Sequence, residues 1–272
     1  MNTERPVFFL SDGTGITAET LGGTVLTQFD TVEFKKTTLP FINSADRARS
    51  IVEYINHVAE QGNRPIIFST IVNDELRTIL RDCRGLYLDL FDTFVTAIEG
   101  ELGQKSTHSS NRAHGVADAH KYESRIDAMN YAMEHDDGQS VRHLDRAQLI
   151  LIAPSRCGKT PTTLYLALQY GLFATNFPLT EEDLEEQALP QTLRPHVAKC
   201  YGLTSTPERL HHVRNERRPG SKYASVAQCA YELRQAESLY RRCNIPYINS
   251  ANMSIEEIAA TILQEKRLSR AF

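Results

Sequence analysis

The sequence predicts an α/β protein of two domains, the first of them doubly wound around a mainly parallel sheet. The chain has 272 residues, which is enough for about two domains of ordinary size. Short apolar runs of strand length alternate with longer segments of helical periodicity, and this alternation is typical of βαβ units. A polar stretch without periodicity then separates two such halves.

The N-terminal half begins with the apolar run Val7–Leu10, which predicts a buried strand. A glycine-rich turn follows and leads into a helix. Ser44 stands where an N-cap is expected, directly before a segment with apolar residues at helical spacing. The elements expected after the first strand are helices at 16–29, 45–60 and 73–83 and strands at 32–38, 65–70 and 85–90.

The pattern fails between the two halves, where the residues are polar and show no period. We therefore expect a first domain at 1–103, a linker or mobile loop at 104–121 and a second domain at 122–272. A helix at 122–134 opens the second domain, and Asp136-Asp137-Gly138 closes that helix.

The second half is organised around the apolar strand at 147–153, which is followed by a glycine-lysine turn. Near the end of the chain, Ser254 and Glu257 form a capping box before an apolar stripe, which predicts a helix packed on the core. The other elements expected in this half are helices at 159–170, 207–218 and 224–243 and strands at 173–177, 199–203 and 245–248.

Composition places the chain among cytoplasmic globular proteins. Lys and Arg number 30 against 34 Asp and Glu, for a net charge of −4, so we expect no nucleic-acid partner. No apolar run approaches the roughly 18 residues of a membrane span, and we expect no membrane association. The five cysteines are scattered and form no CxxC pair, which indicates neither a disulfide framework nor a zinc site.

The sharpest motif follows the strand at 147–153. It matches the P-loop pattern GxxxxGK(S/T), except that alanine replaces the first glycine, and its residues are Ala153, Pro154, Ser155, Arg156, Cys157, Gly158, Lys159 and Thr160. Backbone N–H groups of such a loop wrap a phosphate, the lysine brings charge to it, and the hydroxyl is placed to bind Mg²⁺. The C-terminal domain is therefore predicted to be P-loop kinase-like. Alanine tolerates positive φ poorly, so strain is expected at Ala153.

An acidic turn precedes the motif by about twenty residues. Asp136 or Asp137 is a candidate general base, or a carboxylate that holds Mg²⁺. A simple polar turn that ends a helix is the alternative.

Two further features are candidates for contact with phosphate or a protein partner. Asp12 and Thr14 belong to the glycine-rich turn at 11–15, where an ordinary βα turn is the alternative. Arg214, Arg217 and Arg218 belong to a basic helix whose guanidinium groups suit phosphate, where a solvated helix face is the alternative.

Three segments together resemble a known family. Ser155-Arg156 and Lys159-Thr160-Pro161 resemble the central motif of the regulatory proteins of phosphoenolpyruvate synthase and pyruvate, phosphate dikinase. The family usually has Gly-Val where this chain has Ala153-Pro154. Residues 7–19 (VFFLSDGTGITAE) resemble the family's N-terminal motif, and residues 122–138 resemble the segment that ends in Asp-Asp-Gly. The resemblance covers nearly the whole chain, in order.

The resemblance implies a bifunctional enzyme that regulates its target, with phosphoenolpyruvate synthase favoured over the dikinase. In one direction ADP phosphorylates a threonine of the target and inactivates it. In the other, inorganic phosphate removes that group and pyrophosphate is released. It further implies catalytic roles for Lys159, Arg156 and one acid of the Asp136-Asp137 pair, Mg²⁺ at Thr160, and a homodimer. A P-loop kinase of small molecules and a non-catalytic nucleotide sensor are the alternatives. Modification of Cys157 is expected to block nucleotide binding, because this thiol lies within the loop.

Overall fold

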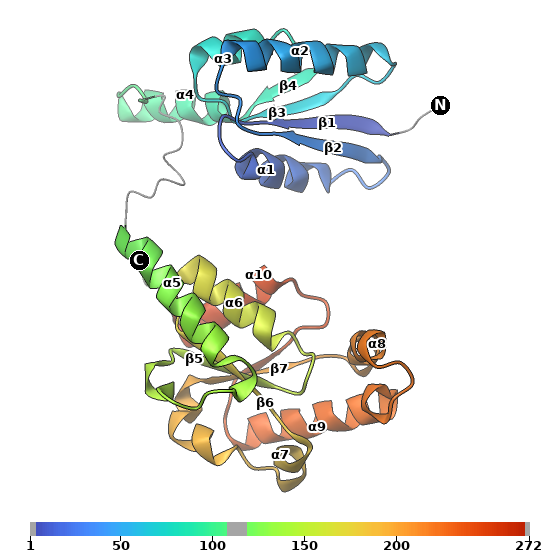
Figure 1. The fold of residues 1–272 in the computed structure, drawn as a ribbon, viewed down its shortest axis with the longest axis vertical. Helices are drawn as coiled ribbons and strands as arrows, with labels where there is room; N and C mark the ends of the chain where they lie inside the picture. The colour runs from blue at the N-terminus through green and yellow to red at the C-terminus, as the bar shows by residue number, and fades with distance from the viewer. Residues whose placement is uncertain (1–3, 108–118, 270–272) are drawn as a thin grey trace. The chain divides into compact units, whose positions relative to one another are not determined.

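The computed structural model describes residues 4–107 and 119–269 and divides the chain into two compact units, 1–115 and 116–272 (Figure 1). Residues 108–118 of the expected linker lie outside the described residues. Within the described ranges, no helix is long and apolar enough to cross a bilayer.

The first unit is a four-stranded parallel sheet in the order β2-β1-β3-β4. Helix α1 covers one face of this sheet, and helices α2 and α3 cover the other (Figure 1). The elements are β1 (Arg5–Leu10), α1 (Ile16–Leu26), β2 (Phe34–Leu39), α2 (Ala45–Glu60), β3 (Ile66–Ser69), α3 (Asp74–Leu80), β4 (Leu86–Asp89) and α4 (Leu90–Leu102).

The central strand β1 explains the two layers of helices. Its side chains alternate between the two faces of the sheet. Val7 and Phe9 pack in the cluster that contains Ala18 of α1, whereas Phe8 and Leu10 belong to a separate cluster with residues of α2 and α3. The predicted doubly wound arrangement is thus present.

The second unit holds another four-stranded parallel sheet, in the order β6-β5-β7-β8. Helices α5, α6 and α10 lie on one face, and α7 and α9 lie on the other (Figure 1). The elements are α5 (Ala119–Glu134), β5 (Leu149–Ala153), α6 (Lys159–Tyr170), β6 (Ala174–Pro178), α7 (Glu181–Glu186), β7 (Cys200–Thr204), α8 (Pro207–Arg217), α9 (Val226–Arg242), β8 (Tyr247–Asn249) and α10 (Ile255–Lys266), with short 3₁₀ turns at Asp136–Gly138, Leu144–Arg146, Gln191–Lys199 and Lys222–Ala224.

Two helices have no counterpart in the sequence prediction. Helix α4 follows β4 directly, and the Asp89 side chain caps it by accepting from the N–H of Asp92. None of its side chains is fully buried, and its apolar residues Phe91, Phe94, Ile98 and Leu102 are exposed. Helix α7 is only six residues long, too short to show a period.

The last strand, predicted at 245–248, begins two residues later than expected. The backbone N–H of Ile245 donates to the carbonyl of Tyr240 and so extends the end of α9. Strand β8 therefore starts at Tyr247.

Candidate active site

The P-loop motif forms the turn between β5 and α6. Strand β5 is fully buried and lies between β6 and β7, so the turn stands at the carboxyl edge of the sheet where the strand order reverses. Ligands of open α/β sheets bind at this position.

The strain expected at Ala153 is not found. Ala153 ends β5 and is not among the residues with positive φ, whereas Arg156 (φ 74°) and Gly158 (φ 86°) are. The left-handed conformation that glycine favours is thus needed at Gly158, and the residue that bears strain is the exposed Arg156. Alanine is compatible with this turn because position 153 is still part of the strand.

Lys159 is buried within its own loop. The residue is only 5% exposed. Its Nζ donates to the carbonyl of Pro154 at 3.3 Å and lies 3.8 Å from Oδ1 of Asp137. Burial lowers the pKa of Lys159, because desolvation disfavours its charged form. Burial of this charge costs free energy, and an anionic ligand beside the ammonium would offset that cost.

Both acids of the Asp136-Asp137 turn reach the loop. Oδ1 of Asp136 accepts a hydrogen bond from Oγ1 of Thr160 at 2.8 Å. Asp137, whose side chain is 56% exposed, forms the ion pair with Lys159. Asp136 thus contacts Thr160, and Asp137 contacts Lys159, the two motif residues expected to bind metal and phosphate. These contacts support the hypothesis that the acidic turn acts together with the motif.

Asn176 joins the acidic turn to the sheet, and the sequence analysis missed it. It lies on β6 and is fully buried. Its Nδ2 donates to Oδ1 of Asp136 at 2.6 Å, and its Oδ1 accepts from the backbone N–H of Asp137 at 3.1 Å. A buried asparagine within a strand was the available signal, because a buried amide needs partners.

Arg214 supports the loop from inside the protein, which corrects its prediction as a contact for phosphate or a partner. The side chain is fully buried. Its guanidinium donates to the carbonyl of Ser155 at 3.1 Å and pairs with Glu232 at 2.6 Å. The hydroxyl of Tyr223 also donates to Oγ of Ser155 at 3.0 Å. Helical spacing turns Arg214 inward and leaves Arg217 exposed.

The side chain of Cys157 is buried in the protein and is not exposed in the loop. The residue is 2% exposed and packs in the hydrophobic cluster beneath the loop. Burial raises the pKa of its thiol to about 12, so the reactive thiolate is almost absent near neutral pH. Thiol reagents should therefore react slowly with Cys157 in the folded protein, and the effect of its modification on nucleotide binding stays a prediction.

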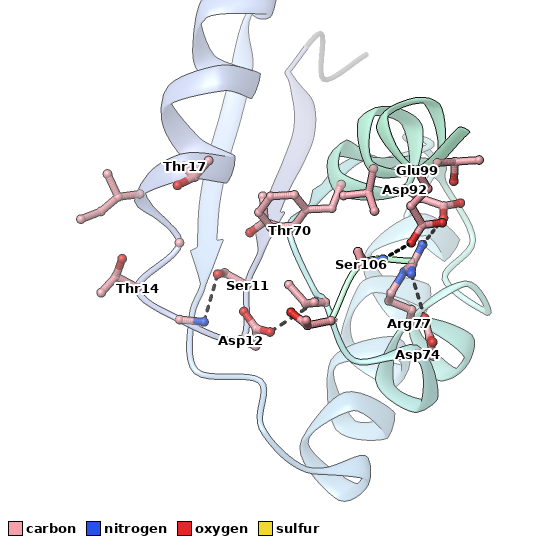
Figure 2. A pocket seen from close by; sticks show the side chains of 18 of the residues that line it. Ser11, Asp12, Thr14, Thr17, Thr70, Asp74, Arg77, Asp92, Glu99 and Ser106 are labelled. Carbon is pink, nitrogen blue, oxygen red and sulfur yellow. Dashed lines mark hydrogen bonds and ion pairs between the residues drawn. The ribbon is translucent and has the colours of Figure 1, made fainter. Parts of the chain in front are cut away.

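Asp12 and Thr14 lie in the first unit, at the turn between β1 and α1, where they line a cavity (Figure 2). Arg217 and Arg218 are exposed at the end of α8. The structure thus gathers Asp136, Asp137, Lys159 and Thr160 at one place.

Comparison with known proteins gives full-length matches. The sequence model of the kinase/pyrophosphorylase family matches residues 7–263. A protein of Pseudomonas fluorescens is 51% identical over 270 residues, covering 99% of both chains. One of Pseudomonas aeruginosa is 50% identical over 273 residues and 100% of both, and one of Bordetella pertussis is 54% identical over 268 residues and 98% of both. Each bears the name "Putative phosphoenolpyruvate synthase regulatory protein".

Proposed function

Because this chain belongs to the kinase/pyrophosphorylase family, we propose that it regulates phosphoenolpyruvate synthase by moving one phosphoryl group on and off a threonine of that enzyme. ADP is the donor of the inactivating reaction, and inorganic phosphate is the acceptor of the activating one. The names of the relatives support the target. The observation that carries the chemistry is the convergence of Lys159, Thr160, Asp136 and Asp137 on one turn.

In the inactivating reaction, the threonine oxygen attacks the β-phosphorus of ADP. The bond from that phosphorus to the bridging oxygen breaks, and AMP leaves with the electron pair. Lys159 and the backbone N–H groups of the turn stabilise the charge on the transferred group. We assign the threonine proton to Asp137, which is exposed to an incoming protein, whereas Oδ1 of Asp136 already accepts from Thr160 and Asn176.

In the activating reaction, an oxygen of inorganic phosphate attacks the phosphorus of phosphothreonine and forms pyrophosphate. The threonine oxygen leaves and takes a proton from Asp137. Arg156 is exposed at the turn, and its guanidinium suits the attacking phosphate. One set of residues thus serves both directions.

The site also fits Mg²⁺. Thr160 and Asp136 present a hydroxyl and a carboxylate whose oxygens are 2.8 Å apart, and Mg²⁺ prefers oxygen ligands. These two residues would hold the ion, which would neutralise charge on the phosphates. The Thr160–Asp136 hydrogen bond keeps both oxygens on the same side of the turn.

The Lys159→Ala variant tests this single site. We expect phosphorylation and dephosphorylation of the synthase each to fall by at least about a hundredfold, the usual effect of removing one charge-stabilising donor. Mass spectrometry of the synthase after incubation with ADP and phosphoenolpyruvate measures the first, and pyrophosphate release measures the second. The exposed Lys222→Ala variant is the matched control and should retain both.

Each other outcome has a definite meaning. Loss of only one direction would contradict a shared site. Absence of any phosphothreonine with the wild-type protein would refute the main proposal. The remaining function would then be that of a small-molecule kinase if the protein consumes nucleotide, or that of a nucleotide sensor if it binds ADP and leaves it unchanged. Modification of the dikinase instead would reassign the target.

A further inference from the structure

Ser155 of the P-loop is held by two side chains that lie far from it in the sequence. Its carbonyl accepts from Nε and Nη2 of Arg214 at 3.3 and 3.1 Å. Its Oγ accepts from the hydroxyl of Tyr223 at 3.0 Å. The backbone and the side chain of this one residue are therefore both fixed from α8 and from the turn that follows α8.

The Tyr223 side chain has little freedom to move. It belongs to the 3₁₀ turn Lys222–Ala224 between α8 and α9. The carbonyl of Tyr223 accepts from Nη1 of Arg214 at 3.0 Å, and Cζ of Arg214 lies 4.2 Å from the centre of the tyrosine ring. Because Arg214 is itself buried and paired with Glu232, it holds the ring in one position beside the loop.

The hydroxyl of Ser155 keeps its own proton for another acceptor. A serine hydroxyl has one proton to donate and two acceptor positions, and Tyr223 uses one of the acceptor positions. Within residues 4–107 and 119–269, the Ser155 hydroxyl donates to no group. A hydroxyl that accepts a hydrogen bond becomes a stronger donor, so this proton is prepared for an acceptor such as a phosphate oxygen.

The same contacts orient a backbone donor of the loop. The described part of the chain has no cis peptide bond, so the N–H of Arg156 points in the direction opposite to the carbonyl of Ser155. That carbonyl faces Arg214, and the N–H of Arg156 therefore points away from it, with no acceptor among the described residues. Successive donors of this kind form the concave anion sites of phosphate-binding loops.

We propose that Tyr223 is a positioning residue for phosphate binding. It holds the Ser155 hydroxyl so that this hydroxyl donates its proton to a phosphate oxygen of the ligand in the loop. Tyr223 acts through Ser155 and needs no contact with the ligand itself. The inference rests on the proposed function for the identity of that ligand, which is ADP or inorganic phosphate.

A double-mutant cycle measured by calorimetric titration of the full chain with ADP tests the proposal. Tyr223→Phe removes the hydroxyl and keeps the ring on Arg214, and Ser155→Ala removes its acceptor. We expect ADP affinity to fall at least about tenfold in Ser155→Ala, the loss of a hydrogen bond to a charged group, and about fivefold in Tyr223→Phe. The double variant should bind ADP within about twofold of Ser155→Ala, because Tyr223 then has nothing to position. Titration with inorganic phosphate should give the same order of affinities.

Tyr247→Phe is the matched control. Tyr247 is also partly buried, and its hydroxyl accepts from Nη1 of Arg241 at 3.0 Å. It begins β8 and so lies at the amino edge of the parallel sheet, opposite to the P-loop. Its ADP affinity should stay within about twofold of the wild type, as expected for a distant substitution. Circular dichroism of each variant establishes that the chain is folded during the titration.

Four results would overturn the proposal. The first is that the wild-type chain binds neither ADP nor phosphate. The second is wild-type affinity in Tyr223→Phe or in Ser155→Ala. The third is a double variant about fiftyfold weaker than the wild type, because losses that multiply belong to independent residues and would give Tyr223 a merely structural role. The fourth is an equal loss in Tyr247→Phe.

These titrations contain no synthase, so they are separate from the test of the proposed reaction. If phosphoryl transfer to the synthase fails while the two losses remain coupled, the proposed reaction is wrong and Tyr223 still positions a phosphate ligand. If transfer occurs and the losses are independent, only the role given to Tyr223 is wrong.

Discussion

At the scale of single residues, Asn176 fixes the acidic turn to strand β6. The turn places Asp137 at φ 49°, a conformation that costs energy for any residue but glycine. The buried amide of Asn176 binds both the carboxylate of Asp136 and the backbone N–H of Asp137. It thus holds the backbone of Asp137 and orients the carboxylate of Asp136, so in the proposed reaction Asn176 is a positioning residue.

The Asn176→Ala variant should lower kcat for phosphoryl transfer by about tenfold to a hundredfold, with KM for ADP changed much less, because a misplaced catalytic group affects the transition state most. Steady-state kinetics measure the two constants. Tyr201→Phe removes another partly buried hydrogen bond of the same unit, from Tyr201 to Glu265, and should leave kcat unchanged. An equal fall in kcat for both variants would show that Asn176 matters only for stability.

At the scale of elements, α8 shows how a charge pattern misleads. Its basic residues suggested one binding surface, but a helix turns successive residues to different faces. Arg214 enters the interior, binds the P-loop carbonyl of Ser155 and pairs with Glu232 of α9. The helix therefore supports the loop through one arginine while its other basic residues face solvent.

Removing Arg214 alone should destabilise the protein. We expect Arg214→Met to lower the free energy of unfolding by about 3 kcal/mol, because Glu232, whose side chain is only 13% exposed, loses its ion-pair partner. The exposed Arg217→Met on the same helix should change it by less than about 0.5 kcal/mol. Urea unfolding measures both. The double variant Arg214→Met, Glu232→Met should lose less than Arg214→Met, and a larger loss would contradict this explanation.

At the scale of the whole molecule, the two units repeat one design. Each has a parallel sheet in which the first strand lies beside the second and third and the fourth stands at the edge. Each core is also separate, since every hydrophobic cluster described lies within one unit. A unit with its own core and of this size has the properties of an independent domain.

Fragments 1–115 and 116–272 should therefore each unfold cooperatively when produced alone. Each retains its complete sheet and the helices on both faces. Thermal unfolding followed by circular dichroism measures the transitions. A fragment that melts without a cooperative transition, or is unfolded at 25 °C, would show that the units depend on each other for stability.

Much of the fold could be predicted because its signals are local. The strand at the centre of each sheet is a continuous apolar run, and helices α2 and α3 begin at side-chain caps, Ser44 and Asn73. Helix α4 was missed although Asp89 caps it and its apolar residues recur at helical spacing, at Phe91, Phe94, Val95, Ile98 and Leu102. Its position matters, however, since Phe91 and Val95 form a wall of the cavity in the first unit.

The sequence by itself determined the turn between β5 and α6, because residues 153–160 are contiguous and their conformation depends on a strand, a left-handed glycine and a helix in succession. Only the tertiary structure decided which distant residues join it. Parallel strands bring their carboxyl ends to one edge, which places Asn176 of β6 beside the turn after β5. The same packing buries Arg214 and brings Asp136 to Thr160, contacts that no local pattern specifies.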